Sequence, residues 1–274
     1  MRGTEPLLTP MLIIVCLVMA LAAAAVNRLV LNGSVWTAPS AAVRAALQLA
    51  AVSTVLAVAL QRVWSSMLVL VVMFIVASIT AARRSQARHG AGWLPVALAA
   101  GMVMVIPLLT LSGVVPFTGV AVVPVFGIVL GGTMTASAVA ARRALDALSQ
   151  RAGELEAALG LGLSERFSRM LIIERPLSDA LLPNLDQART AGLVTLPGAF
   201  VGVLLATGSA AQAAAVQVLV LVSLLLAQVC GVAVVGELVA RGKITRPNDA
   251  IAPPSDANPI FAFARRLGLA PTAR

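Results

Sequence analysis

Long apolar stretches alternate with short polar ones along most of the chain. The apolar stretches run over residues 7–26, 43–61, 64–82, 93–112, 120–141, 190–207 and 215–238. Each approaches the ~20 apolar residues that a helix needs to cross the hydrocarbon core of a bilayer. A closed β-barrel would instead show alternating polarity along strands of ~10 residues, and these stretches are apolar throughout. The pattern therefore predicts an all-α polytopic membrane protein with seven transmembrane helices.

The composition supports this fold class. Hydrophobic residues make up 59% of the 274 residues, charged residues only 11%, and the mean hydropathy is +0.97. Soluble domains average about 25% charged residues, so a chain this apolar cannot cover a surface that faces water. A net charge of +9 would suggest nucleic-acid binding in a soluble protein. In a membrane protein, however, basic residues mark cytoplasmic loops, so we expect no nucleic-acid partner.

The distribution of Lys and Arg orients the predicted helices. With the N-terminus outside and each helix reversing direction, 18 of the 20 Lys and Arg residues face the cytoplasm, leaving Arg2 and Arg62 outside. The positive-inside rule therefore predicts an outer N-terminus and a cytoplasmic C-terminus. Arg2, the first apolar stretch and the alanines at 22–25 also resemble a signal peptide. We expect the first helix to be retained, because an outer N-terminus makes the whole charge pattern consistent.

Residues 142–189 form a long polar segment between the fifth and sixth predicted helices. Its seven Arg residues are balanced by seven Asp and Glu residues, whereas a lipid-binding patch would carry excess basic charge. Apolar residues recur at helical spacing, and Gly160 with Gly162 ends a first helix. Ser164 is a candidate N-cap for a second helix that stops at Pro176. We expect a transmembrane domain over 1–247 with a helical cytoplasmic loop at 142–189, and a mobile cytoplasmic tail over 248–274.

This loop also carries a recognisable motif. Glu156-Ala157-Ala158 is followed four residues later by Gly162, and then by Ile172 and Pro176. The spacing resembles the EAA loop of ABC-transporter permeases, in which a short helix ended by a Gly turn sits on a partner ATPase and transmits its movement. In an Ala-rich chain, Glu-Ala-Ala is equally compatible with an ordinary helix segment. The resemblance implies ATPase coupling by Glu156, Ala157, Ala158, Gly160, Gly162, Arg166, Met170 and Pro176.

A longer pattern resembles the FetB/YbbM family, the membrane subunit of a two-component ABC system linked to iron export. The matching segments are Ala158–Gly160 through Arg189–Gly198, Val43–Ala45 with Gln48-Leu49, Val123-Pro124 with Gly127, Gly131 and Met134, and Gln217. One departure is Gly132, where the family pattern has Asn. The resemblance implies a permease, with a plant relative associated with aluminium tolerance widening the range of substrates.

The chain lacks an ATP-binding motif of its own. A P-loop needs Gly, four residues and then Gly-Lys-Ser/Thr, so that backbone amides and the Lys hold the phosphates. Its nearest approach is Gly236 to Gly242-Lys243-Ile244, where the spacing is one residue too long and Ile replaces the hydroxyl residue. We therefore expect no cofactor in this chain, and ATP and Mg on a separate cytosolic ABC ATPase subunit.

Polar and helix-breaking residues inside the apolar stretches are candidates for a transport pathway or hinge. Polar groups in lipid are costly unless they face the interior of the bundle, and Pro or Gly allows a helix to bend. Hydrogen bonds between helices and ordinary kinks would explain the same residues without a transport role. No metal-ligand cluster is identifiable, and no catalytic residue is proposed. The pathway or hinge candidates are Gln48, Pro124, Met134, Arg189, Pro197, Gly198 and Gln217.

Two classes of function remain open from the sequence. The first is a homodimeric ABC permease in the bacterial inner membrane, which exports iron or a related metal cation or carries a different small substrate. The second is an intramembrane enzyme or a sensor. An enzyme would need catalytic groups that converge at helix ends, and no His/Asp pair, Ser/His arrangement or acidic metal motif occurs. The pattern therefore favours a transport subunit over an enzyme.

Overall fold

The computed structural model describes residues 10–30, 32–59, 63–113 and 118–246, with only the backbone for 10, 55–59, 63 and 120. The chain divides into two compact units at the boundary between Arg62 and Val63. Both units are helical over most of the residues that are described. The predicted tail at 248–274 lies outside the described residues, so its mobility stays a prediction.

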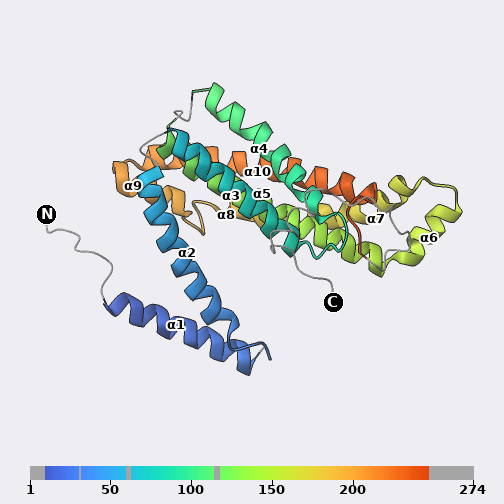
Figure 1. Ribbon diagram of the computed structural model, residues 1–274, viewed down its shortest axis with the longest axis horizontal. Helices are drawn as coiled ribbons and strands as arrows, with labels where there is room; N and C mark the ends of the chain where they lie inside the picture. The colour runs from blue at the N-terminus through green and yellow to red at the C-terminus, as the bar shows by residue number, and fades with distance from the viewer. Residues whose placement is uncertain (1–9, 31, 60–62, 114–117, 247–274) are drawn as a thin grey trace. The chain divides into compact units, whose positions relative to one another are not determined.

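The first unit is a helical hairpin. Helix α1 (Pro10–Leu29) and helix α2 (Thr37–Ala59) pack on each other and are joined by a short turn (Figure 1). The side-chain amide of Asn27 donates to the carbonyl oxygen of Ser34 at 2.9 Å, and the Gly33 amide donates to the Asn27 carbonyl oxygen at 3.0 Å. The second bond satisfies a carbonyl that the end of α1 leaves without a helical partner, and the first fixes the turn against the helix.

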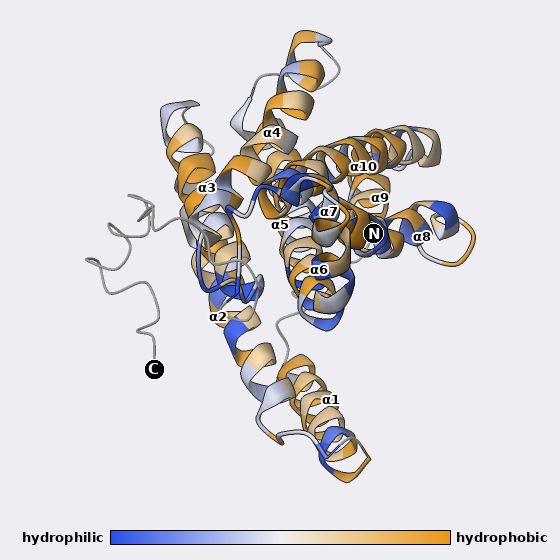
Figure 2. Ribbon diagram, turned by 90° about the vertical axis from the view of Figure 1, so that its right-hand side faces the viewer, coloured by the Kyte–Doolittle hydropathy of each residue, from blue (hydrophilic) through white to orange (hydrophobic). Residues whose placement is uncertain are grey.

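The second unit is a bundle of four long helices that carries the shorter ones. Its long helices are α3 (Val63–Arg84), α4 (Leu94–Leu111), α5 (Gly119–Gln150) and α10 (Ala210–Ala240), and the one-turn 3-10 helix η1 (Ala91–Trp93) precedes α4. Helix α10 packs on α4 and α5, and α5 also packs on α3 and α4. Buried Leu98, Leu130 and Val235 lie in the resulting core. Figure 2 shows that these long helices are mainly hydrophobic, whereas hydrophilic residues gather on α6 and α8.

The prediction of a polytopic helical membrane protein is confirmed. Five described helical segments are long and apolar enough to cross a bilayer: Met11–Leu29, Trp64–Arg84, Ala91–Leu111, Ala121–Gln150 and Ala210–Ala240. The expected span at 43–61 is helical over Thr37–Ala59, but its last residues lie outside the described part of the chain. The count of seven spans and the orientation stay predictions.

The sixth apolar stretch differs from the expected single helix at 190–207. Helix α8 (Leu182–Thr190) is followed by a turn, and helix α9 (Gly198–Thr207) has only 10 residues. Ten residues span about 15 Å, which is half of the ~30 Å hydrocarbon core. The break has a local cause: Gly192 has φ +84° and donates to the Thr195 carbonyl oxygen at 2.8 Å, and Pro197 caps α9.

The polar segment is helical, as predicted, but its boundaries shift. Helix α5 continues to Gln150 instead of ending near residue 141, because Leu145 and Leu148 extend its buried face. Helices α6 (Ala152–Gly160) and α7 (Glu165–Asp179) then form a hairpin. In Figure 1 this hairpin lies at one end of the second unit, and α9 lies toward the other end.

Candidate functional site

The α6–α7 hairpin (residues 152–179) is closed by a turn with well-defined hydrogen bonds. The Gly162 amide donates to the Leu159 carbonyl oxygen at 2.9 Å, and the Leu163 amide donates to the Ala158 carbonyl oxygen at 3.2 Å. This is the Schellman arrangement, which needs a residue of positive φ just past the helix end, and Gly162 has φ +85°. The Ser164 side chain then accepts from the Phe167 amide at 3.4 Å. The predicted glycine break and N-cap are therefore confirmed.

Pro176 does not end the second helix of the loop, contrary to the sequence-based expectation. Helix α7 continues through Pro176 to Asp179. A proline inside a helix leaves the carbonyl four residues earlier without its usual donor, and here that carbonyl belongs to Ile172. The Arg151 guanidinium donates to the Ile172 carbonyl oxygen at 3.3 Å. An arginine from the α5–α6 connection thus satisfies the freed group and lets the helix continue.

Arg151 is also held by a second partner. Its Nε donates to Glu154 Oε1 at 2.7 Å, and its Nη2 pairs with the other carboxylate oxygen. The hydrogen bond from Arg151 lowers the pKa of the Glu154 carboxyl. Both side chains are exposed, so the pair fixes the direction of α6 more than it adds to folding stability.

The outer surface of the hairpin combines a carboxylate with apolar side chains. Glu156 and Ala157 are exposed on α6, whereas Leu155 packs into the core. Four large, exposed apolar side chains follow in the turn and on α7, and the most exposed of the four is Leu161, at 83%. The residues of this apolar stripe are Leu161, Leu163, Phe167 and Leu171. An exposed apolar stripe at a polar end of a protein is typical of a surface that another protein covers.

The hairpin is tied to α10 by an ion pair between residues 71 positions apart. Arg166 Nε donates to Glu237 Oε1 at 2.8 Å, and Arg166 Nη2 donates to Glu237 Oε2 at 2.7 Å. The same carboxylate accepts from Arg241, one turn further along. Two parallel bonds between a guanidinium and a carboxylate fix orientation as well as distance. The loop motif includes Arg166, whereas nothing in the sequence around Glu237 marks it as the partner, because the two residues are 71 positions apart.

Close backbone packing supports the same contact. A side chain at Gly236 would bring its Cβ to 2.6 Å from Leu177 Cδ1 of α7, and one at Gly242 would overlap the Arg169 guanidinium. Arg169 is itself buried, with its side chain 6% exposed, and it pairs with Glu165 at 3.7 Å. Glycine at these two positions therefore lets α7 rest directly against the polar end of α10.

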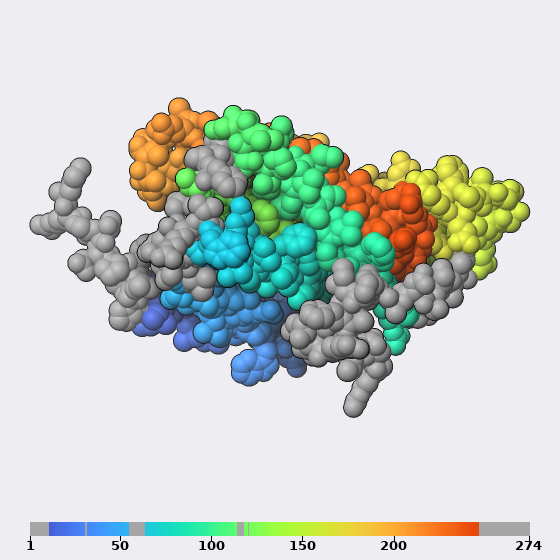
Figure 3. All heavy atoms as spheres, turned by 45° about the horizontal axis from the view of Figure 1, so that its top comes forward, coloured from blue at the N-terminus to red at the C-terminus, as the bar shows by residue number. Residues whose placement is uncertain are grey.

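The α10 junction (residues 236–246) also holds the connection between α3 and α4. The His89 amide donates to the Thr245 carbonyl oxygen at 3.2 Å, and the Thr245 amide donates to the His89 carbonyl oxygen at 3.1 Å. The ammonium of Lys243 lies 4.5 Å from the centre of a Trp93 ring. In Figure 3 the end of α10, in red, lies between the α3–α4 segment and the α6–α7 hairpin. The junction thus joins three parts of the chain that are distant in sequence.

Arg246 completes the α10 junction. Its guanidinium pairs with Asp146 of α5, and its Nε donates to the Gln86 carbonyl oxygen at 3.1 Å. Asp146 also lines an open groove of about 590 Å³ beside the hairpin. The residues of this groove are Arg143, Asp146, Ala147, Gln150, Pro176, Asp179, Leu182, Pro183 and Asp186.

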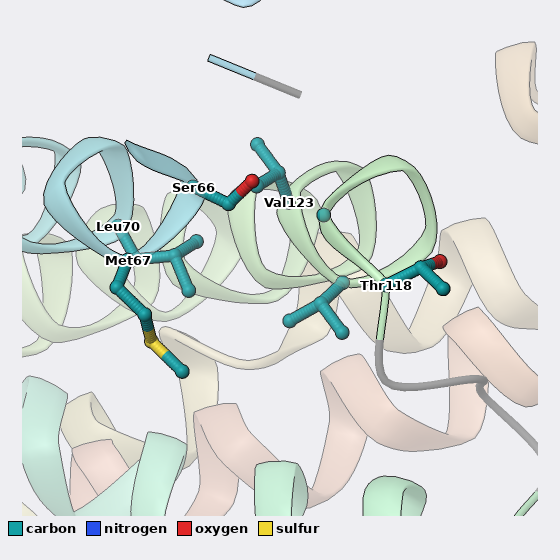
Figure 4. Close-up of a pocket in the computed structure, with 7 residues that line it drawn as sticks. Ser66, Met67, Leu70, Thr118 and Val123 are labelled. Atoms are coloured by element: carbon teal, nitrogen blue, oxygen red, sulfur yellow. The ribbon is translucent and has the colours of Figure 1, made fainter. Parts of the chain in front are cut away.

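A second, smaller pocket lies at the other end of α5 and offers little chemistry. Figure 4 shows Ser66, Met67 and Leu70 of α3 facing Thr118 and Val123 at the start of α5. The surface of this pocket is apolar. Among the residues that the structure describes, no three His, Cys, Asp or Glu side chains gather into a group that could hold a metal ion.

Three of the pathway or hinge candidates come together at the start of α9. Pro197 caps the helix, Gly198 is its first residue, and the side-chain oxygen of buried Gln217 accepts from the Phe200 amide at 3.1 Å. A first-turn amide has no partner within its own helix. Gln217 therefore satisfies the break in the sixth stretch, which is the hydrogen-bonding role that the sequence analysis gave as the alternative to a pathway.

The other candidates lie on α2 of the first unit and on α5 and α8 of the second. Pro124 lies inside α5, and Met134, also on α5, packs against the core. Arg189 on α8 is exposed and pairs with Asp186 at 3.3 Å. Gln48 is exposed on α2 of the first unit.

A further polar side chain on α10, also a candidate for a polar pathway from the sequence, is fully buried. Gln228 of α10 is fully buried, and neither its Nε2 nor its Oε1 has a hydrogen-bond partner among the described residues. A Cβ at Gly132 would lie 2.8 Å from Gln228 Nε2, so the amide occupies the space that a side chain at 132 would take. Ser137 Oγ is buried nearby and is also unpaired. We call Gly132, Thr133, Ser137, Gln228 and Gly231 the α5–α10 seam.

Residues 8–243 match the model of a protein family that is described as an uncharacterised protein family (UPF0014). The chain belongs to this family. The UPF0014 match includes the whole α6–α7 hairpin and Glu237, and it ends at Lys243, just before Thr245 and Arg246.

The chain is similar in sequence to several named membrane proteins. The UPF0014 membrane protein STAR2 of rice (Oryza sativa subsp. japonica) is 32% identical over 220 residues, or 78% of this chain and 75% of STAR2. ALUMINUM SENSITIVE 3 of Arabidopsis thaliana is 32% identical over 183 residues, or 65% of this chain and 66% of that protein. The probable iron export permease protein FetB of Escherichia coli is 28% identical over 130 residues, or 47% of this chain and 50% of FetB. No solved structure matches the chain.

Proposed function

We propose that this UPF0014 protein is the membrane-spanning permease subunit of an ABC transporter, which exports iron or a related metal cation. The observation that carries the proposal is the α6–α7 hairpin. It presents an exposed Glu156 and an exposed apolar stripe on a tightly hydrogen-bonded Gly162 turn. A rigid protruding turn that is directly tied to a long apolar helix is well suited to receive movement from a partner.

The partner in this proposal is a cytosolic ABC ATPase that binds ATP and Mg. The chain has no P-loop of its own, since Ile244 stands where a hydroxyl residue would meet magnesium. The ATPase would take the apolar stripe and Glu156 in a groove of its surface. Two copies of the chain and two ATPase subunits would then form the complex, in the inner membrane, with the hairpins on the cytoplasmic side. The excess of Lys and Arg in the loops supports this orientation.

The proposed cargo rests on names of relatives. FetB is named as a probable iron export permease, and the name ALUMINUM SENSITIVE 3 makes aluminium the second cation to test. The described residues hold no cluster of metal-ligating side chains.

The docking part of the proposal is tested by charge reversal on the hairpin. We expect Glu156→Lys to leave membrane insertion intact and to abolish copurification of the ATPase, because it reverses the charge beside the apolar stripe. Asp186→Lys is the control, since Asp186 is an exposed carboxylate on α8, outside the hairpin. Normal ATPase association with Glu156→Lys would refute the hairpin as the docking surface.

The cargo part is tested separately in inverted membrane vesicles that contain the chain and its ATPase. We expect ATP-dependent uptake of Fe²⁺ into the vesicles, and no uptake when the ATPase is omitted. Parallel assays with Al³⁺ and other cations measure selectivity. If the ATPase associates normally but none of these cations is transported, the metal cargo is refuted and the assignment as an ABC permease subunit stands.

A further inference from the structure

The hairpin meets α10 at contacts that differ in their distance from the turn. Leu177 packs against Gly236 near the far end of α7, and Arg169 packs against Gly242 beyond the end of α10. Arg166 lies in the first turn of α7, only four residues after Gly162. Its ion pair with Glu237 is therefore the direct link between the turn of the hairpin and α10 itself.

Helix α10 is in a position to carry movement from this link into the bundle. It is a continuous helix of 31 residues, and it packs on α4, α5, α7 and α9. Glu237 lies nine residues after the unpaired Gln228, which is about 14 Å along a helix. A displacement of Glu237 along the axis of α10 would reach the α5–α10 seam, because a helix transmits axial movement through its own hydrogen bonds.

The geometry of the pair suits transmission better than it suits stability. Exposed ion pairs add little to the free energy of folding, and the Arg166 and Glu237 side chains are 56% and 29% exposed. Two parallel hydrogen bonds nevertheless fix the direction of the contact. Arg241 bonds the same carboxylate from the position just after α10, and among the described residues this bond links Glu237 to no other helix.

We propose that Glu237 is a positioning residue that passes movement of the α6–α7 hairpin to α10 through its paired hydrogen bonds with Arg166. This inference rests on the proposed function, because the movement originates in an ATPase bound to the hairpin. It adds that the ion pair couples ATP hydrolysis to transport, whereas the turn and the apolar stripe bind the ATPase.

The experiment uses the full chain with its copurifying ATPase in lipid nanodiscs and vesicles. It compares the wild type with Glu237→Ala, Arg166→Ala and the reversed pair Arg166→Glu with Glu237→Arg. Two control variants remove other ion pairs: Arg241→Ala takes away the bond within α10, and Asp186→Ala breaks the exposed Asp186–Arg189 pair of α8. The first readout is the amount of Fe²⁺ transported per ATP hydrolysed. The second, which needs no cargo, is the change in amide hydrogen exchange that a non-hydrolysable ATP analogue causes in α7 and at the end of α10.

In the wild type we expect the nucleotide to change exchange in both α7 and α10. In Glu237→Ala and in Arg166→Ala we expect the response to remain in α7 and to disappear from α10, with normal ATPase association. Transport per ATP should fall about five-fold or more, which is the lower end of typical coupling between sites. The reversed pair should restore both readouts, and the two controls should match the wild type.

Different failures have different meanings. If Glu237→Ala keeps the α10 response and the transport ratio, or if the reversed pair restores neither, the coupling role of the ion pair is overturned and the proposed permease function is untouched. If no ATPase associates with the wild-type chain, the proposed function fails and this inference fails with it. Arg166→Ala tests the same link from the loop side, should Glu237→Ala not accumulate in the membrane.

Discussion

Helix α10 is held in two different ways along its length. In the α5–α10 seam it lies close to its neighbours through glycines, and Gln228 and Ser137 are left without hydrogen bonds. In the α10 junction it is held by the Arg166–Glu237 ion pair and by backbone hydrogen bonds with His89. Lipid provides no hydrophobic drive for helices to associate, so close packing through small residues takes its place. At the junction the Arg166 and Glu237 side chains are partly exposed, so their polar contact forms at lower cost than one buried in the core.

The comparison suggests a division of roles. A firmly paired junction suits a region that must keep its geometry while it passes on force. The unpaired polar groups of the seam lower the free energy of unfolding, since burying an amide without hydrogen-bond partners is unfavourable. Such a seam is the place where a second arrangement of α5 and α10 would be most readily stabilised. Three substitutions test this contrast, in addition to the experiments on Glu156 and Glu237.

The largest effect is expected from Gly90→Ala, which would break the junction. Gly90 has φ +73°, and a Cβ there would overlap the Lys243 carbonyl oxygen. Backbone strain and overpacking together should cost about 3 kcal/mol of folding stability. Thermal unfolding in nanodiscs measures the loss. Gly153→Ala is the control, because a Cβ at Gly153 would meet nothing within 4 Å; equal melting of the two variants would contradict the tight junction.

A smaller loss is expected from Gly101→Ala, which tests how closely α4 approaches α10. A Cβ at Gly101 would lie 2.6 Å from the Ala227 carbonyl oxygen, so the backbones of the two helices would have to separate. We expect a loss of about 2 kcal/mol, measured in the same way. Gly131→Ala in α5 is the matched control, since it has open space around its Cβ position. An unchanged Gly101→Ala variant would show that the α4–α10 contact is loose.

The smallest effect, and one of opposite sign, is expected from Gln228→Met. Methionine has a similar volume and carries no group that needs a hydrogen bond, so the variant should be more stable by about 1 kcal/mol. If the unpaired amide serves a second arrangement of the seam, transport should fall while stability rises. A lower melting temperature would instead mean that Gln228 has a partner in the native protein, such as a bound water.

Some features of the fold were predictable because they depend on neighbours in sequence. Uniform apolar stretches marked the helices that became α1, α3, α4, α5 and α10. The Schellman turn at Gly162 and the cap at Ser164 involve residues at most five positions apart, and their residue types announce them. The motif Glu156-Ala157-Ala158 was likewise placed on a short helix before a glycine turn, as the structure has it.

Other predictions failed because the structure at those positions depends on residues outside the local sequence pattern. Pro176 was expected to end a helix, and it does not, because Arg151 reaches the Ile172 carbonyl from 21 positions away. The sixth apolar stretch was read as one helix, although the turn at Gly192 divides it and Gln217 of another helix satisfies the start of α9. Hydropathy averages over a window and cannot show such a break.

The sequence by itself determined that this protein lies in a membrane as a set of helices and that a charged, glycine-interrupted loop divides the fifth and sixth apolar stretches. Burial of apolar residues and local capping are properties of short segments, and a sequence displays them directly. Only the tertiary structure decided that Arg166 meets Glu237, that Thr245 pairs with His89, and that Gln228 stays unpaired. The partners in the first two contacts are 71 and 156 positions apart, so they depend on how the helices pack and not on the pattern along any one of them.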